Sequence, residues 1–204
     1  MNRKKFLKSL QALTGWRESA FMLCLAERAL PNAVLFLDST NTLELDGQRY
    51  PKGLLSLMDQ SWDALIVQRQ EDVIIDCLDN VVAQMHQEEG QDQYGILPTN
   101  DCLGIWEQAL VSGLNRDKKR ALDMSQLSLE TITQFLEFSV GDDMDENALI
   151  KLFDTHDLVK REFSFQEEAA DMLRASQSPS TAFIKGFRAL AADDGVSNIG
   201  ISIE

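Results

Sequence analysis

The apolar residues of the chain recur every three or four positions, which is the spacing of an amphipathic α-helix and not the alternation of a β-strand. Few helix-breaking residues interrupt this pattern, since the 204 residues include 4 prolines and 11 glycines. The periodic segments predict helices over 6–13, 16–30, 33–37, 50–68, 72–85, 99–113, 117–140, 146–153, 158–173 and 179–195. We therefore predict an all-α protein that forms a single compact bundle of about eight to ten helices.

The breaks between these segments set the predicted organisation. Pro31 fits the first turn of a helix, where its missing amide costs nothing, so we expect a new short helix after it. Residues 40–49 predict a polar loop with a turn at Asp46-Gly47. After Gly195 the apolar spacing no longer fits a helix, and it predicts a short extended C-terminal tail against the core. Because no linker divides the chain, we expect residues 1–204 to form one domain.

Charge and cysteine content narrow the partners and the compartment. The chain carries 33 acidic and 19 basic residues, for a net charge of −14, which repels phosphate backbones and predicts no nucleic-acid partner. The longest apolar run, 20–26, is far shorter than the roughly 20 residues that cross a bilayer, so we predict no membrane span and a cytoplasmic protein. Cys24, Cys77 and Cys102 are widely separated in helical patterns, which predicts buried free thiols.

The basic N-terminal arm has two interpretations. Arg3, Lys4, Lys5 and Lys8 lie beside the apolar residues Phe6, Leu7 and Leu10, as in a helix that docks on an acidic surface or a membrane. Packing on the acidic body of the same chain is the simpler interpretation, because the opposite charge is already present at high effective concentration.

Catalytic and metal-binding motifs are missing from the sequence. It has no GxSxG, GxGxxG or GxxxxGKS/T pattern and only two histidines. His86 with Glu89, and His156 between Asp154 and Asp157, are the candidates for metal ligation, but neither has the HExxH spacing. We therefore predict no catalytic residue, no metal and no cofactor, and we lean away from an enzyme.

Glu27 and Arg28 are the most informative charged residues, because they interrupt the apolar run from Phe21 to Leu30. A helix that is apolar around most of its circumference must be covered on most faces, so at least one of these charges should be buried. An unpaired buried ion is costly, and Asp101 is the candidate partner for Arg28, with Asp63 second. Such a pair would either fix the helix register or line a ligand pocket.

Several segments add a resemblance that periodicity cannot provide. They are Trp16, Phe21-Met22-x-Cys24-Leu25-x-Glu27-Arg28-x-x-Pro31-Asn32, Asp46-Gly47-Gln48, Tyr94-Gly95-x-x-Pro98 with Asp101-Cys102, Lys185-Gly186-x-Arg188, and Gly195-x-Ser197-Asn198-Ile199-Gly200-Ile201. Together they resemble the bacterial YjaG family, whose function is unknown. The resemblance implies an all-helical cytoplasmic protein, and gene neighbourhoods in the family hint at histidine-kinase signalling. It supplies no catalytic residues.

The matching positions give the candidate site and the predicted function. Six matching residues are nominated as a binding or buried polar site: Glu27, Arg28, Asn32, Asp101, Ser197 and Asn198. The match is weak over 141–180, which makes that region a doubtful place to seek the function of the family. We predict a non-catalytic cytosolic helical binding or signalling module with a protein partner. The alternative is a small-molecule-binding protein or enzyme that uses Glu27, Arg28 and Asp101.

Overall fold

The computed structural model describes residues 3–40, 44–45, 48–49, 52–85, 94–115, 120–141 and 144–202. Its α-helices are α1 (Arg3–Gln11), α2 (Trp16–Thr40), α3 (Lys52–Trp62), α4 (Glu71–Ala83), α5 (Ile96–Leu114), α6 (Ala121–Val140), α7 (Glu146–Thr155), α8 (Asp157–Ala175) and α9 (Thr181–Ala192). A π-helix, η1 (Asp63–Gln68), follows α3, and a 3-10 turn, η3 (Asp193–Gly195), follows α9. The strands β1 (Glu44–Leu45) and β2 (Gln48–Arg49) form a two-residue antiparallel pair. The predicted all-α fold is confirmed.

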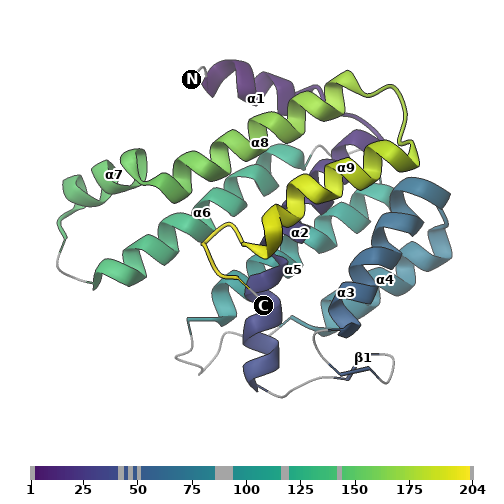
Figure 1. Ribbon diagram of the computed structural model, residues 1–204, viewed down its shortest axis with the longest axis horizontal. Helices are drawn as coiled ribbons and strands as arrows, with labels where there is room; N and C mark the ends of the chain where they lie inside the picture. Colours follow the sequence, from purple (N-terminus) through teal and green to yellow (C-terminus); the bar gives the residue numbers. More distant parts are fainter. Residues whose placement is uncertain are drawn as a thin grey trace.

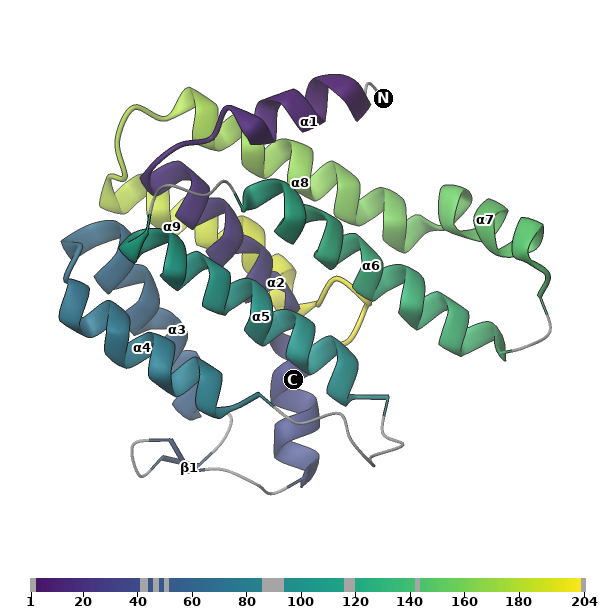
Figure 2. The same cartoon turned by 180° about the vertical axis from the view of Figure 1, so that it is seen from behind.

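Helix α2 is the centre of the bundle. It lies between α5 on one side and α9 on the other, with α6 and α8 completing its surroundings (Figures 1 and 2). All residues from Ala20 to Ala26 are at most 1% exposed, because α2 has neighbours around most of its circumference. The segment Trp16–Leu37 is apolar and long enough to cross a membrane, but 89% of its most apolar window is buried, as in the central helix of a soluble protein.

The prediction that α2 ends near Leu30 was wrong. The helix continues through Pro31 to Thr40, although a proline inside a helix costs about 3 kcal/mol. Burial offsets that cost, since Ala33, Val34 and Leu37 beyond the proline are all buried in the core. Local propensity therefore gave way to tertiary packing.

Two further helix boundaries differ from the prediction. The segment 50–68 is divided, because α3 ends at Trp62 and the chain continues as a π-helix that closes at Arg69 in the left-handed region (φ 57°). The hydrophobic spacing cannot show the wider turn of a π-helix. Helix α5 begins at Ile96 and not at Thr99, because Pro98 fits the first turn, where no amide donor is needed.

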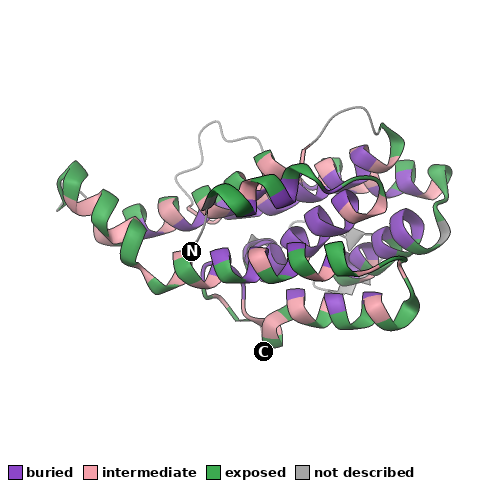
Figure 3. Cartoon of the chain, turned by 90° about the horizontal axis from the view of Figure 1, so that it is seen from above, coloured by how far each residue is buried: buried purple, intermediate pink, exposed green. Residues whose placement is uncertain are grey.

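The α6–α7 end of the molecule projects from the bundle, and its exposed surface is visible in Figure 3. None of the residues of α7 is buried. Asp145 caps the N-terminus of α7, and its Oδ1 accepts a hydrogen bond from the amide of Ala148 at 2.8 Å. Residues 142 and 143, like the predicted turn at 46–47, lie outside the described residues.

Helix α1 packs on the body of the same chain. Phe6 and Leu10 are buried, and the Phe6 ring lies 4.7 Å from that of Phe163 on α8. Lys5 lines a small recess beside Glu167 and Asp171 of α8. These contacts support the intramolecular interpretation of the basic arm.

The C-terminal tail lies against the core, as predicted. Val196 and Ser202 form an antiparallel bridge, and Gly200 (φ 86°) turns the chain between them. Ile199 joins Ile132 and Leu136 of α6 in a second, smaller hydrophobic cluster. The tail thereby carries two polar residues of the candidate site into the interior. The organisation as one domain stays a prediction.

Candidate functional site

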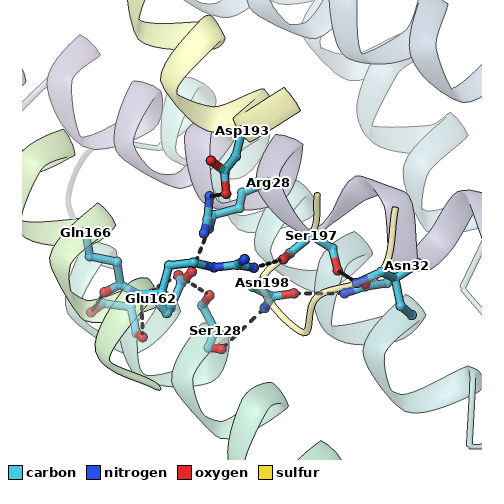
Figure 4. A network of polar contacts seen from close by, with 11 residues as sticks. Arg28, Asn32, Ser128, Glu162, Gln166, Asp193, Ser197 and Asn198 are labelled. Atoms are coloured by element: carbon cyan, nitrogen blue, oxygen red, sulfur yellow. Dashed lines mark hydrogen bonds and ion pairs between the residues drawn. The ribbon is translucent and has the colours of Figure 1, made fainter. Parts of the chain in front are cut away.

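Arg28 of α2 lies at the centre of a polar network that connects α2 with α8 and with η3 (Figure 4). Its Nε donates to Glu162 Oε2 at 2.8 Å, and its Nη1 donates to Asp193 Oδ2 at 3.0 Å. The guanidinium also lies 4.3 Å from the centre of the Phe165 ring. The side chains of Arg28 and Glu162 are 2% and 0% exposed, so the prediction that at least one charge of α2 is buried is confirmed.

Both carboxylate oxygens of Glu162 accept hydrogen bonds from side chains of this chain. Its second oxygen, Oε1, accepts hydrogen bonds from Ser128 Oγ at 2.8 Å and from Gln166 Nε2 at 2.9 Å. Gln166 Oε1 in turn accepts from Ser125 Oγ at 2.5 Å. Both oxygens of a fully buried carboxylate are therefore occupied by donors of this chain, which is what a stable buried charge requires.

The C-terminal tail completes the network on the next turn of α2 (Figure 4). Asn32 Nδ2 donates to Asn198 Oδ1 at 2.9 Å, and Asn198 Nδ2 donates to the Ser128 carbonyl at 3.4 Å. The Ser197 carbonyl accepts from Arg161 Nη2 at 2.6 Å. Four of the six nominated residues, namely Arg28, Asn32, Ser197 and Asn198, are thus brought together, and all four are buried.

The predicted partners of Arg28 were wrong. Arg28 pairs with Glu162 and Asp193, and not with Asp101 or Asp63. Asp101 lies on α5 and accepts a hydrogen bond from Thr131 Oγ1 at 2.7 Å, one turn of α6 away from Ser128. Asp101 was the candidate because it precedes Cys102 on a mostly apolar helix. That position in the sequence does not show which face of α2 is covered by α5.

Glu27 points to a different face of α2 from Arg28 and has its own partners. Arg188 of α9 donates to Glu27 Oε1 from Nε at 3.0 Å and from Nη2 at 2.6 Å. Trp62 Nε1 donates to Glu27 Oε2 at 3.0 Å. Arg188 Nη2 also contacts Asp59 Oδ1 at 2.7 Å, on the exposed side. This second set, Glu27, Arg188, Trp62 and Asp59, is called the Glu27 cluster below.

Burial and ion pairing act in opposite directions on the pKa values of Glu27 and Arg188. Burial raises the pKa of Glu27 above its usual value of 4.5, although the hydrogen bonds from Arg188 and Trp62 act in the opposite direction. Burial acts to lower the pKa of Arg188, but the hydrogen bond and charge of Glu27, together with those of Asp59, outweigh it and raise that pKa. The two groups therefore form an ion pair that is only partly protected from water.

An open groove of about 470 Å³ lies over the Glu27 cluster. One wall is the face of α9 that carries Lys185, Arg188 and Ala189, and the other wall is the π-helix at Asp63 and Val67. We call this feature the α9 groove. π-Helical turns occur frequently at functional sites, and a partly buried carboxylate with a raised pKa in a cleft is a further mark of such a site.

The candidate metal ligands and the cysteines that the structure describes have structural contacts. Within the described ranges no three histidine, cysteine or acidic side chains come together as a metal site. His156 Nδ1 accepts from the Leu158 amide and caps α8, while His86 lies outside the described residues. The three cysteines are free and buried, as predicted, and burial raises the pKa of the Cys24 thiol well above its usual value.

Sequence reasoning missed several residues of both sets. Glu162 lies in 141–180, the region that the resemblance marked as a doubtful place for function, and yet it holds Arg28. Asp193 lies two residues before Gly195, at the end of the helix predicted over 179–195, and its position gives no sign of a buried partner. Arg188 had a signal, because it belongs to the Lys185-Gly186-x-Arg188 segment, but it was not nominated.

Comparison with known proteins shows which family the chain belongs to. Uncharacterized protein YjaG of Salmonella typhimurium is 27% identical over 196 residues, which cover 96% of this chain and 95% of that protein. An uncharacterized protein of Haemophilus influenzae is 28% identical over 202 residues, which cover 98% and 97%. The crystal structure of a DUF416 family protein from Shewanella baltica superposes with a TM-score of 0.82 at 24% identity, over 97% of this chain and 98% of that one, and so shows the same fold. The family model described as "Protein of unknown function (DUF416)" matches residues 5–202, and the chain therefore belongs to this family.

Proposed function

We propose that the protein is a non-catalytic, cytosolic binding module that holds a partner protein in the α9 groove. The observation that carries this proposal is the position of Glu27, whose carboxylate is fixed by Arg188 and Trp62 at the base of an open groove with an apolar strip. Such a surface offers shape and anchoring contacts. The suggested link to histidine-kinase signalling stays a prediction that rests on the resemblance.

The hydrogen bonding supports binding over catalysis. A general base needs a free lone pair within reach of a substrate proton. Glu27 Oε1 accepts two hydrogen bonds from Arg188, and Oε2 accepts one from Trp62 and one from Arg188 Nε. Both oxygens of Glu162 also accept hydrogen bonds from this chain, and Glu162 is fully buried, out of reach of a substrate. Both carboxylates thus serve to position other groups, which agrees with a module that binds and does not transform its partner.

The buried network supports the same division of roles. Arg28, Glu162 and Asn198 connect α2, α8 and the C-terminal tail, which fixes how these segments pack. Glu27 and Arg28 belong to two separate sets, and among the described residues the lining of the α9 groove includes Glu27 and Arg188 but no residue of the Arg28 network. A cytosolic location is supported by three free cysteine thiols that are buried in the core.

Photo-crosslinking from the groove tests the proposal. Ala189 is exposed and lines the groove. Ala83 of α4 is also exposed, but it does not line the groove. We would place p-benzoylphenylalanine at each position in turn and irradiate cells that express the full chain. We expect discrete protein adducts from Ala189 that Ala83 does not give. No adduct from Ala189, or the same adducts from both positions, would contradict the proposal.

The size of the groove also fits a small-molecule site, which keeps the alternative of a small ligand open to test. Its volume of about 470 Å³ lies in the range of roughly 300–1,000 Å³ that is usual for ligand pockets. Native mass spectrometry of the purified protein would reveal a bound small mass. Loss of that mass in Val67→Asp, which places a charge on the groove wall, would favour this second candidate.

A further inference from the structure

The α9 groove follows α9 along its whole length. Six residues of this helix line it: Thr181, Ile184, Lys185, Arg188, Ala189 and Ala192. Their spacing of three and four places them on one face, and at 1.5 Å per residue the face runs for about 16 Å. A groove of this length accommodates three turns of a second helix.

The exposed apolar residues that line the groove are Val67, Ala189 and Ala192. Val67 on the π-helix is 50% exposed, and Ile184 lies at the base on the α9 side. Ala189 and Ala192 have short side chains, so another backbone can approach α9 closely.

The two walls carry opposite charges without ion-pair partners. Lys185 on α9 and Asp63 on the π-helix are both exposed, and neither forms an ion pair within the part of the chain that the structure describes. Arg188 differs, because Glu27 and Asp59 already neutralise it. A bound segment therefore meets one free positive charge along one edge and one free negative charge along the other.

We propose that the α9 groove takes an amphipathic helix of a partner protein, with a basic flank against Asp63 and an acidic flank against Lys185. This inference rests on the proposed function and names the kind of partner. Apolar side chains at positions i, i+3, i+4 and i+7 of that helix cover Val67, Ala189 and Ala192. The net charge of −14 favours a partner that is basic overall, and it opposes a second copy of this chain as the occupant.

A designed peptide serves as the probe. It is a fluorescein-labelled helix of about five turns with leucines on one face, lysines on one flank and glutamates on the other. Fluorescence anisotropy measures its affinity for the full chain and for Asp63→Lys, Lys185→Glu and the double variant. We expect each single variant to weaken binding by about fivefold, because one attraction becomes a repulsion. The double variant should restore the affinity, since the peptide can then lie in the reverse direction.

Matched charge reversals far from the groove provide the control. Asp123→Lys on α6 and Lys151→Glu on α7 change exposed residues by the same amounts of charge. We expect both to leave the affinity within about twofold of the wild type, because distant surface charges are screened by salt. Circular dichroism of every variant verifies that the bundle is folded.

Three results would overturn the inference: no saturable binding of the peptide to the wild type, no recovery in the double variant, or equal effects of groove and control reversals. Self-association detected by sedimentation that competes with the peptide would identify a second copy as the occupant and would overturn it as well. Discrete adducts from Ala189 without peptide binding would leave the proposed function standing and reject only the helical partner.

Discussion

Arg28 and Glu162 each depend on the other for their stability inside the bundle. Removal of one partner from a buried pair leaves an uncompensated charge, and this costs about 3–5 kcal/mol. We expect Arg28→Met or Glu162→Leu alone to lower the free energy of unfolding by about this amount. The double variant should lose much less than the sum, because two apolar side chains then replace two charges.

Urea unfolding of the wild type, the two single variants and the double variant measures this coupling. Additive losses would show that Arg28 and Glu162 do not depend on each other, contrary to their 2.8 Å contact. Asp193 is not substituted in any of these variants, and its side chain is 42% exposed, so water can solvate its charge when Arg28 is replaced.

The Glu27 cluster makes a smaller contribution to stability. Glu27→Ala would leave Trp62 Nε1 and one edge of Arg188 without an acceptor, which costs about 1–3 kcal/mol for groups that are mostly buried. Glu130→Ala, at an exposed position on α6, is the matched control and should change stability by less than about 0.5 kcal/mol. Denaturant melts with equal midpoints for both variants would contradict the burial of Glu27.

The raised pKa of Glu27 gives a pH dependence with a definite sign. Because the pKa in the folded state lies above the usual 4.5, the folded protein binds this proton more readily than the unfolded chain does. The penalty of the buried charge is therefore complete above the folded pKa, and it is relieved as the pH falls through that value toward 4.5. We expect the wild type to gain stability relative to Glu27→Gln between pH 7.5 and pH 5, as measured by urea unfolding. A relative loss would show that the ion pair with Arg188 outweighs burial.

At the scale of elements, two glycines of α5 provide a matched pair. A Cβ atom at position 113 would overlap with Leu65 Cδ1 on the buried side of the π-helix, whereas a Cβ atom at position 104 would meet no other atom within 4 Å. Gly104→Ala should stabilise the protein by about 0.5–1 kcal/mol through helix propensity. Gly113→Ala should destabilise it by about 1–3 kcal/mol through overpacking against Leu65. Thermal melts that shift upward for both variants would contradict the close packing of α5 on the π-helix.

The existence of most helices could be predicted from apolar spacing, since each buries one face. Their boundaries could not be predicted where packing outweighs local preference, as at Pro31, or where the wider turn of the π-helix follows Trp62. The cap at Asp145 was predictable because its side chain acts within one turn. The helix cap depends on residues that are close together in the sequence, so a single sequence contains the information for it.

For the whole molecule, the sequence predicted that charges in α2 would be buried but not what would meet them. Arg28 and Glu162 are 134 positions apart, and a single sequence contains no signal for such a pair. The same holds for Arg188, which is 161 positions from Glu27. Only the packing of α8 and α9 beside α2 brings these groups together, so the two separate sets could be seen only in three dimensions.

These sets divide the molecule into a buried network that connects its helices and a groove in which we propose that a partner binds. The most direct test measures crosslinking from Ala189 in two backgrounds, Arg28→Met with Glu162→Leu, and Val67→Asp, after circular dichroism has shown that both are folded. The account predicts that the adducts persist when the buried pair is replaced and disappear when a charge is placed on the groove wall. Loss of the adducts in the first background together with their survival in the second would contradict it.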